Sequence, residues 1–177
     1  MFRKAYMDDL DKISAIYDEI HTEEESGKVS IGWIRGIYPT EQTAYDSILK
    51  GDMFVETDNG NIVAAAKINK EQVPEYSDAK WIYEVPDELI MVLHTLVVSP
   101  KYKGCGYGTA FVDFYENYAL TNGCSYLRMD TNEKNANARR LYKKLGYTEV
   151  SVVDCCFNGI DGVRLVCLEK KIQHHED

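Results

Sequence analysis

Long hydrophobic runs are absent from this sequence of 177 residues, and no stretch approaches the roughly 20 apolar residues that a membrane-spanning helix needs. The opening residues, MFRKAYMDDLDK, also lack the apolar core of a secretory signal, because acidic side chains interrupt them. We therefore expect a cytoplasmic protein with no membrane partner. The length predicts one domain over residues 1–171, followed by a frayed tail at residues 172–177.

Positive charge is also scarce, since 20 basic residues stand against 29 acidic ones and the net charge is −9. Nucleic-acid-binding domains usually carry a basic face, so this balance argues against a nucleic-acid partner. The deficit lies in residues 1–90, with 9 basic and 19 acidic side chains, whereas residues 91–177 have 11 and 10. The second half is therefore the better place for an anion, and the first half the better place for a cation.

Cysteine and histidine patterns that build a disulfide framework or a metal site are missing. The five cysteines include no CxxC pair, and Cys155 adjoins Cys156, so we expect reduced thiols. The four histidines have no ligand spacing, and we expect no metal. A redox-sensitive Cys105 is an alternative to a merely permissive loop position.

The order of apolar runs and turn signals predicts a layered α/β domain with a mostly antiparallel sheet. The clearest turn signal is Asp58-Asn59-Gly60, which joins two apolar runs as a β-hairpin. Residues 70–87 hold two prolines and no periodicity, so they predict a long loop. We expect helices near residues 10–20, 40–50, 109–121 and 135–145, and strands near 2–5, 53–57, 61–69, 88–98, 125–130, 147–153 and 163–169.

The most informative stretch is KGCGYG at residues 103–108, between an apolar run and a helix pattern. Glycines at every second position leave backbone amides uncovered, so an oxyanion can approach several N–H groups at once. Phe111, Phe114, Tyr115 and Tyr118 follow at helical spacing, which places a helix N-terminus beside the same anion. The stretch therefore predicts a phosphate-binding turn.

Three nucleotide-binding patterns compete for this turn. Walker A needs a lysine and Ser or Thr after its last glycine, but Thr109 and Ala110 follow Gly108. The Rossmann fingerprint would put its third glycine at Thr109 after an unusually long loop, although Asp130 lies near the expected position of the ribose-binding acid. The third pattern is an acyl-CoA loop reading Gln or Arg, two residues, Gly, one residue, Gly or Ala. The turn matches it except that Lys103 replaces Gln or Arg.

This loop resembles that of the GNAT acetyltransferases, and a second motif strengthens the resemblance. Asn135, Ala138 and Tyr142, followed by Gly146-Tyr147, are similar to the family's second cofactor motif. The resemblance covers nearly the whole chain. It implies a mixed, mostly antiparallel central sheet with helices on both faces and a splayed pair of parallel strands that binds acyl-CoA.

The resemblance also implies where acetyl-CoA lies. It places the thioester between strands at residues 93–98 and 125–130, with the Leu96 N–H as the donor to its carbonyl oxygen. The residues that it assigns to cofactor binding are Leu96, Val97, Val98, Lys103, Gly104, Cys105, Gly106, Tyr107, Gly108, Thr109, Asn135, Ala138 and Tyr142.

Proton transfer needs an acid and a base. Tyr142 resembles the family's general acid, with a core-facing aromatic residue as the alternative. The family's strand glutamate corresponds to Val92 here, and strand alternation would put Val92, His94 and Leu96 on one face. We therefore predict His94 as the base, because a histidine pKa near 6.5 suits proton transfer at neutral pH. The alternative for His94 is that it is a core residue without a catalytic role. The alternative base is Glu84 or Glu88, acting through a water molecule.

The resemblance implies direct transfer of acetyl from acetyl-CoA to a primary amine of a small molecule or peptide. The acidic first half and its aromatic residues predict an acceptor site formed by Trp33, Tyr38, Tyr83 and Glu84. A non-catalytic acyl-CoA sensor is the alternative from another functional class. The oligomeric state stays open, with a homodimer as one candidate.

Overall fold

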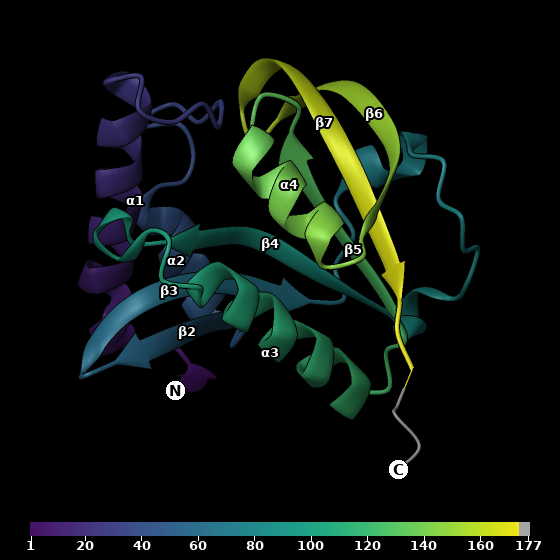
Figure 1. Ribbon diagram of the computed structural model, residues 1–177, viewed down its shortest axis with the longest axis horizontal. Helices are drawn as coiled ribbons and strands as arrows, with labels where there is room; N and C mark the ends of the chain where they lie inside the picture. Colours follow the sequence, from purple (N-terminus) through teal and green to yellow (C-terminus); the bar gives the residue numbers. More distant parts are fainter. Residues whose placement is uncertain (174–177) are drawn as a thin grey trace.

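The computed structural model describes residues 1–173 and contains one seven-stranded sheet in the order β1-β2-β3-β4-β5-β7-β6 (Figure 1). All neighbouring strands are antiparallel except β4 and β5, which are parallel. This confirms the predicted mixed, mostly antiparallel sheet. The strands are β1 (Phe2–Lys4), β2 (Met53–Asp58), β3 (Asn61–Asn69), β4 (Ile90–Val98), β5 (Tyr126–Asn132), β6 (Thr148–Phe157) and β7 (Ile160–Lys171).

Four α-helices cover the sheet: α1 (Leu10–Glu25), α2 (Glu41–Leu49), α3 (Tyr107–Thr121) and α4 (Ala136–Lys144). α3 and α4 bury Phe111, Tyr115 and Tyr142 against one face of the sheet. α1 and α2 pack on the opposite face beside β2, β3 and β4 (Figure 1). The helices therefore lie on both faces, as predicted.

Most elements follow their local patterns. The β2–β3 hairpin turns at Asn59 and Gly60, which both have positive φ, 47° and 78°, as a tight two-residue hairpin turn requires. α1 differs, because it extends to Glu25, beyond the predicted end near residue 20. Residues 22–25 of its last turn are polar and at least partly exposed, so apolar spacing does not reveal them.

The loop predicted at residues 70–87 contains two short 3-10 turns, η2 (Pro74–Asp78) and η3 (Asp87–Leu89). We call residues 70–89 the insertion. It covers the part of the second face that α1 and α2 leave open, and its Tyr76 is buried with Val92 and Leu165. The insertion is therefore part of the hydrophobic core.

The parallel pair β4–β5 opens along its length. Its ladder joins residues 90–93 to residues 126–129, whereas β4 continues to Val98 and β5 to Asn132. Beyond the ladder the two strands diverge, with β4 passing toward α1 and β5 toward α4 (Figure 1). This gives the predicted splayed pair, and backbone groups on the inner edges of both strands have no strand partner there.

A β-bulge interrupts β4 at Thr95, whose φ is +53°. Before it, Val92 faces the core of the insertion and Leu93 faces α3 and α4. After it, Leu96 packs on the same side as Leu93. The prediction that Val92, His94 and Leu96 share one face is therefore wrong, because the extra residue shifts the alternation by one position.

At the C-terminal end, Ile172 is buried in the core and its N–H donates to the Ser125 carbonyl oxygen at 2.9 Å. Residues 174–177 of the predicted tail lie outside the described residues. None of the helices within residues 1–173 is both long and apolar enough to cross a membrane.

Candidate active site

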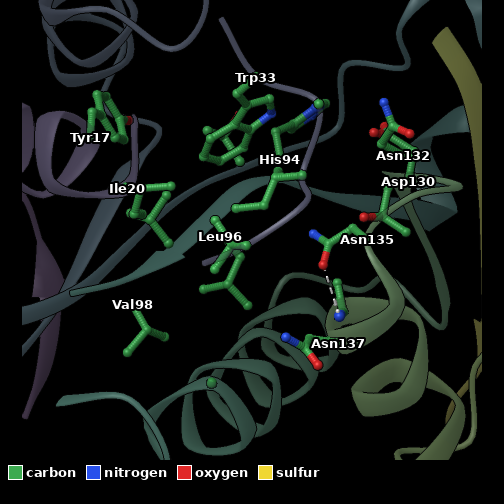
Figure 2. A pocket seen from close by; sticks show the side chains of 18 of the residues that line it. Tyr17, Ile20, Trp33, His94, Leu96, Val98, Asp130, Asn132, Asn135 and Asn137 are labelled. Carbon is green, nitrogen blue, oxygen red and sulfur yellow. Dashed lines mark hydrogen bonds between the residues drawn. The ribbon is translucent and has the colours of Figure 1, made fainter. Parts of the chain in front are cut away.

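A cavity of about 1050 Å³ opens where β4 and β5 diverge. Its size is at the upper end of ligand sites, which occupy roughly 300–1,000 Å³. It extends from the glycine turn between the two strands to the loop at residues 26–40, which joins α1 and α2 (Figure 2). The predicted site residues that line it are Trp33, Tyr38, His94, Leu96, Val97, Val98, Lys103, Gly104, Gly106, Tyr107, Gly108, Thr109, Asn135, Ala138 and Tyr142.

The glycine turn has the geometry of an anion site. Gly104 and Gly106 have φ of +80° and +88°, and a Cβ built on either would meet nothing within 4 Å. α3 begins at Tyr107, directly after Gly106, so its first N–H groups have no partner within the helix. Open space, helix amides and the nearby Lys103 fit the diphosphate of a CoA ester.

Gly108 and Cys105, also in the turn, differ from Gly104 and Gly106. A Cβ on Gly108 would lie 3.3 Å from Leu141 and 3.8 Å from Val98, so this glycine lets α3 approach α4 and β4 closely. Cys105 is exposed and does not line the cavity. The structure thus gives no cavity contact to this predicted cofactor residue.

The second motif builds the start of α4. The Asn135 side chain accepts the Ala138 N–H at 3.2 Å, which is an N-cap (Figure 2). Seven residues after the cap, Tyr142 is buried and lines the cavity. Burial, together with the charge of Asp130, raises the pKa of Tyr142. The phenol therefore carries its proton at neutral pH and is available as a donor.

His94 is held by a polar contact at the cavity wall. Asn69 donates through Nδ2 to Asp52 at 2.9 Å, which leaves its Oδ1 to accept from His94 Nε2 at 2.9 Å. Burial, with the positive charge of Lys67, lowers the pKa of His94 to about 4. The imidazole is therefore neutral at pH 7 and is a weak base, contrary to the ordinary histidine pKa on which its predicted role depends.

Asp130 is a cavity residue that motif reasoning considered only for a dinucleotide site. It lies near the end of β5 and points into the cavity, next to Asn132 (Figure 2). The Tyr76 hydroxyl donates to Asp130 Oδ2 at 2.7 Å. Burial raises the pKa of Asp130 to about 6, against the opposing effect of this hydrogen bond. The available sequence signal was an acid at the carboxyl end of an apolar strand.

The loop at residues 26–40 closes the far end of the cavity. The Glu24 carboxylate accepts the N–H groups of Ile31 and Gly32 at 2.7 and 2.9 Å, which holds the loop to α1. Trp33 and Tyr38 meet edge to face, with ring centroids 6.1 Å apart. These two rings therefore form an aromatic wall at the end of the cavity away from the glycine turn.

Tyr83 and Glu84 do not join that wall. Tyr83 packs against Tyr126 with ring centroids 5.3 Å apart, and Glu84 is exposed. Neither residue lines the cavity, because the end of the insertion runs along the other side of β5. The structure thus separates them from the predicted acceptor site.

Comparison with known proteins shows the family. The chain belongs to the acetyltransferase (GNAT) family, whose model matches residues 13–147. An uncharacterized N-acetyltransferase of Methanocaldococcus jannaschii is 30% identical over 76 residues, which cover 43% of this chain and 34% of that protein. The chain thus spans about a third of the length of this curated relative.

Solved structures share the fold over nearly the full chain. A GNAT family acetyltransferase from Streptococcus agalactiae 2603 has a TM-score of 0.80 at 24% identity, covering 98% of this chain and 95% of that one. YncA from Salmonella typhimurium, solved with its cofactor acetyl-CoA, has a TM-score of 0.69 at 15% identity, covering 100% of this chain and 96% of that one. The family and its neighbours are acetyltransferases, and they include N-acetyltransferases.

Proposed function

We propose that this protein transfers the acetyl group of acetyl-CoA directly to a primary amine of a small molecule or peptide. The observation that carries the proposal is the single cavity that joins an open glycine turn, the gap between β4 and β5, and a buried tyrosine. The structure of YncA with acetyl-CoA supports the choice of cofactor within this fold. The acceptor would lie beside Trp33 and Tyr38, at the end of the cavity opposite the turn.

Bound acetyl-CoA would supply an activated acetyl thioester. Residues 103–109 would hold its diphosphate through backbone N–H groups, the α3 N-terminus and Lys103. The free inner edge of β4 would pair with the amides of its pantetheine arm, as a peptide adds to a sheet edge. The Leu96 N–H would polarise the carbonyl, an interaction typically worth about 3 kcal/mol of the barrier.

Tyr142 is the proton donor in this proposal. Its hydroxyl makes no hydrogen bond to any described residue and is therefore free to donate to the departing sulfur, and its raised pKa keeps it protonated at neutral pH. His94 contributes less as a base than the sequence suggested, since its pKa is about 4 and Nε2 already donates to Asn69. In this proposal His94 lines the part of the cavity that would hold the acceptor.

A thiol-release assay tests the proposal. The protein is incubated with acetyl-CoA and separate amines, and free CoA is detected with a thiol reagent while mass spectrometry detects the acetylated amine. We expect both products for at least one amine. Absence of acetyl-CoA binding in isothermal titration would refute the proposal. Binding without thiol release for any amine would support the acyl-CoA sensor instead.

A further inference from the structure

The Asp130 carboxylate lines the cavity and points into it (Figure 2). Tyr76 bonds to Oδ2, and Oδ1 has no hydrogen-bond partner among residues 1–173. Asp130, Tyr142 and Tyr38 all line this cavity, and the charge of Asp130 raises the pKa of both tyrosines, so the acid lies near the proposed proton donor and near the aromatic wall.

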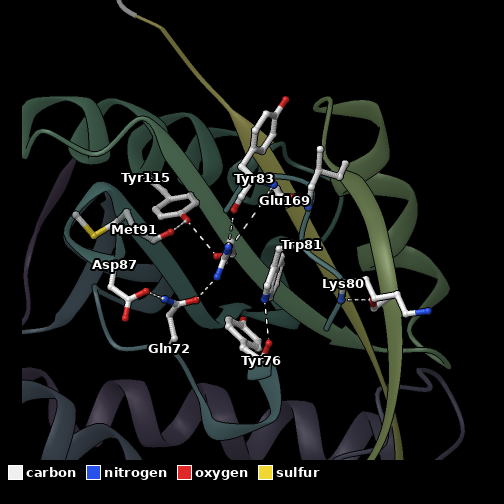
Figure 3. Close-up of polar contacts among 12 residues, drawn as sticks. Gln72, Tyr76, Lys80, Trp81, Tyr83, Asp87, Met91, Tyr115 and Glu169 are labelled. Carbon is white, nitrogen blue, oxygen red and sulfur yellow. Dashed lines mark hydrogen bonds and ion pairs between the residues drawn. The ribbon is translucent and has the colours of Figure 1, made fainter. Parts of the chain in front are cut away.

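The insertion brings Tyr76 to this acid from 54 residues away. Trp81 donates to the Tyr76 carbonyl oxygen at 3.0 Å (Figure 3), and the two rings meet edge to face with centroids 5.0 Å apart. The Arg128 guanidinium lies over Trp81, 4.1 Å from the ring centroid. The Glu169 carboxylate accepts the N–H groups of residues 82 and 83. These contacts fix Tyr76 and, through it, the Asp130 carboxylate.

No basic side chain among the described residues stabilises the Asp130 charge. Burial and the negative Glu75 raise the pKa of Asp130, and only the Tyr76 hydrogen bond lowers it. A buried carboxylate without a cation is costly, and a bound cation would remove that cost. The titratable groups that face this acid are Glu75 and Tyr76 of the insertion, Tyr38 of the 26–40 loop, Tyr142 of α4, Cys155 of β6 and Cys167 of β7.

We propose that Asp130 binds the acceptor as a primary alkylammonium ion and takes one of its protons, and that Tyr76 is the residue that positions the carboxylate. The inference rests on the proposed acetyl transfer and names the acceptor class and the base. The aromatic wall of Trp33 and Tyr38 lines the same cavity as Asp130 and would contact the ammonium group and its alkyl chain.

Two residues that line the cavity, Asp130 and Tyr142, account for every proton transferred in the proposed reaction. Asp130 accepts one proton from the ammonium nitrogen, whose lone pair forms the bond to the acetyl carbon as the carbon–sulfur bond breaks. Tyr142 donates its proton to the departing sulfur and regains one from the new amide nitrogen. Asp130 then releases its proton to solvent, which restores the site.

The pH dependence of kcat/KM tests this inference with n-butylamine, 1,4-diaminobutane and lysine at saturating acetyl-CoA. In the wild type, kcat/KM should rise up to about pH 6, where Asp130 ionises, and stay level to pH 9 because the ammonium form is the one bound. Asp130→Asn must use the free amine, about one molecule in a thousand at pH 7.4 for a pKa near 10.4. We expect a loss of about 10³-fold at that pH and a tenfold recovery per pH unit.

Glu116→Gln is the matched control, because Glu116 also accepts a tyrosine hydroxyl, that of Tyr147 at 3.0 Å, yet does not line the cavity. It should keep the wild-type profile, and acetyl-CoA affinity should be unchanged in Asp130→Asn. Identical profiles in wild type and Asp130→Asn would overturn the inference. So would a wild-type kcat/KM that itself rises tenfold per unit from pH 7 to 9, a result that does not depend on any variant folding.

Different results would show that the proposed acetyl transfer itself is wrong. Wild-type protein that does not bind acetyl-CoA refutes acetyl transfer itself. Wild-type protein that binds acetyl-CoA and acetylates none of the three amines refutes the alkylammonium class and leaves the cofactor assignment intact.

Tyr76→Phe tests the positioning role separately. Its hydroxyl stabilises the ionised carboxylate, so its loss should move the rising limb of the pH profile above pH 6. The level part of the profile should change by only a few-fold, since the ring still packs on Trp81. An unmoved limb would refute the positioning role of Tyr76.

Discussion

Replacing Gly106 with alanine tests the phosphate turn without adding charge. Gly106 has a φ of +88° and no atom within 4 Å of a built Cβ, so its folding cost is the left-handed backbone alone, about 1–2 kcal/mol. Gly123, after α3, has a φ of +75° and equally open surroundings, which makes Gly123→Ala the matched control. For this chain length 1 kcal/mol shifts Tm by about 2–4 °C, so both variants should melt about 2–8 °C below wild type.

The two variants should differ in acetyl-CoA binding. Only the methyl group on Gly106 enters the space that faces the cavity and would hold the diphosphate away from the turn amides. We expect at least tenfold weaker binding in Gly106→Ala, about 1.4 kcal/mol, and wild-type affinity in Gly123→Ala. Thermal melts without ligand and isothermal titration with acetyl-CoA provide the measurements. Equal affinity in all three proteins would refute the assignment of the turn.

Three further predictions concern the acid, the loop and the N-terminus. Tyr142→Phe should lower kcat by about 10²-fold or more with unchanged acetyl-CoA affinity, and an unchanged kcat would leave Tyr142 a packing role only. Glu24→Gln weakens the acceptor for two loop amides, so KM for the amine should rise several-fold while titration shows unchanged acetyl-CoA affinity. The Arg3 guanidinium donates two hydrogen bonds to the Asp9 carboxylate, at 2.6 and 2.9 Å, so Asp9→Asn should lower the unfolding free energy at pH 7 by about 1–2 kcal/mol. Arg3 holds the pKa of Asp9 below its usual range, so this stability is present above about pH 4 and lost toward lower pH; denaturant unfolding from pH 2 to 7 checks the slope.

Elements with strong local signals could be predicted from the sequence. The β2–β3 hairpin depends on Asn59 and Gly60, which adopt positive φ within the turn itself. α3 depends on aromatic side chains at helical spacing, and Phe111 and Tyr115 are indeed fully buried. The glycine turn was recognisable for the same reason, because its conformation requires glycine at two positions close together in the chain, Gly104 and Gly106.

Contacts between distant segments could not be predicted in this way. The Tyr76–Asp130 hydrogen bond joins a loop without periodicity to the end of a strand, and the buried Glu169 and Arg128, both distant in sequence, help to hold that loop in place. The same anchoring turns Tyr83 away from the cavity, although aromatic composition suggested an acceptor role for it. Composition identifies the residue types of a site, whereas long-range packing selects its members.

The bulge at Thr95 determines which side chains of β4 face the cofactor gap. A β-branched residue at φ +53° costs about 1–3 kcal/mol and persists only where its surroundings hold it, here through the hydroxyl contact between Thr95 and Tyr38. With regular alternation, Leu96 would face the side of Val92 instead of α3 and α4. The bulge turns Leu96 and Val98 toward the side of Tyr142, and Tyr38 links this segment to the acceptor wall. The bulge at Thr95, which the alternation of side chains in the sequence does not reveal, thus connects the gap between β4 and β5 with the acceptor end of the same cavity.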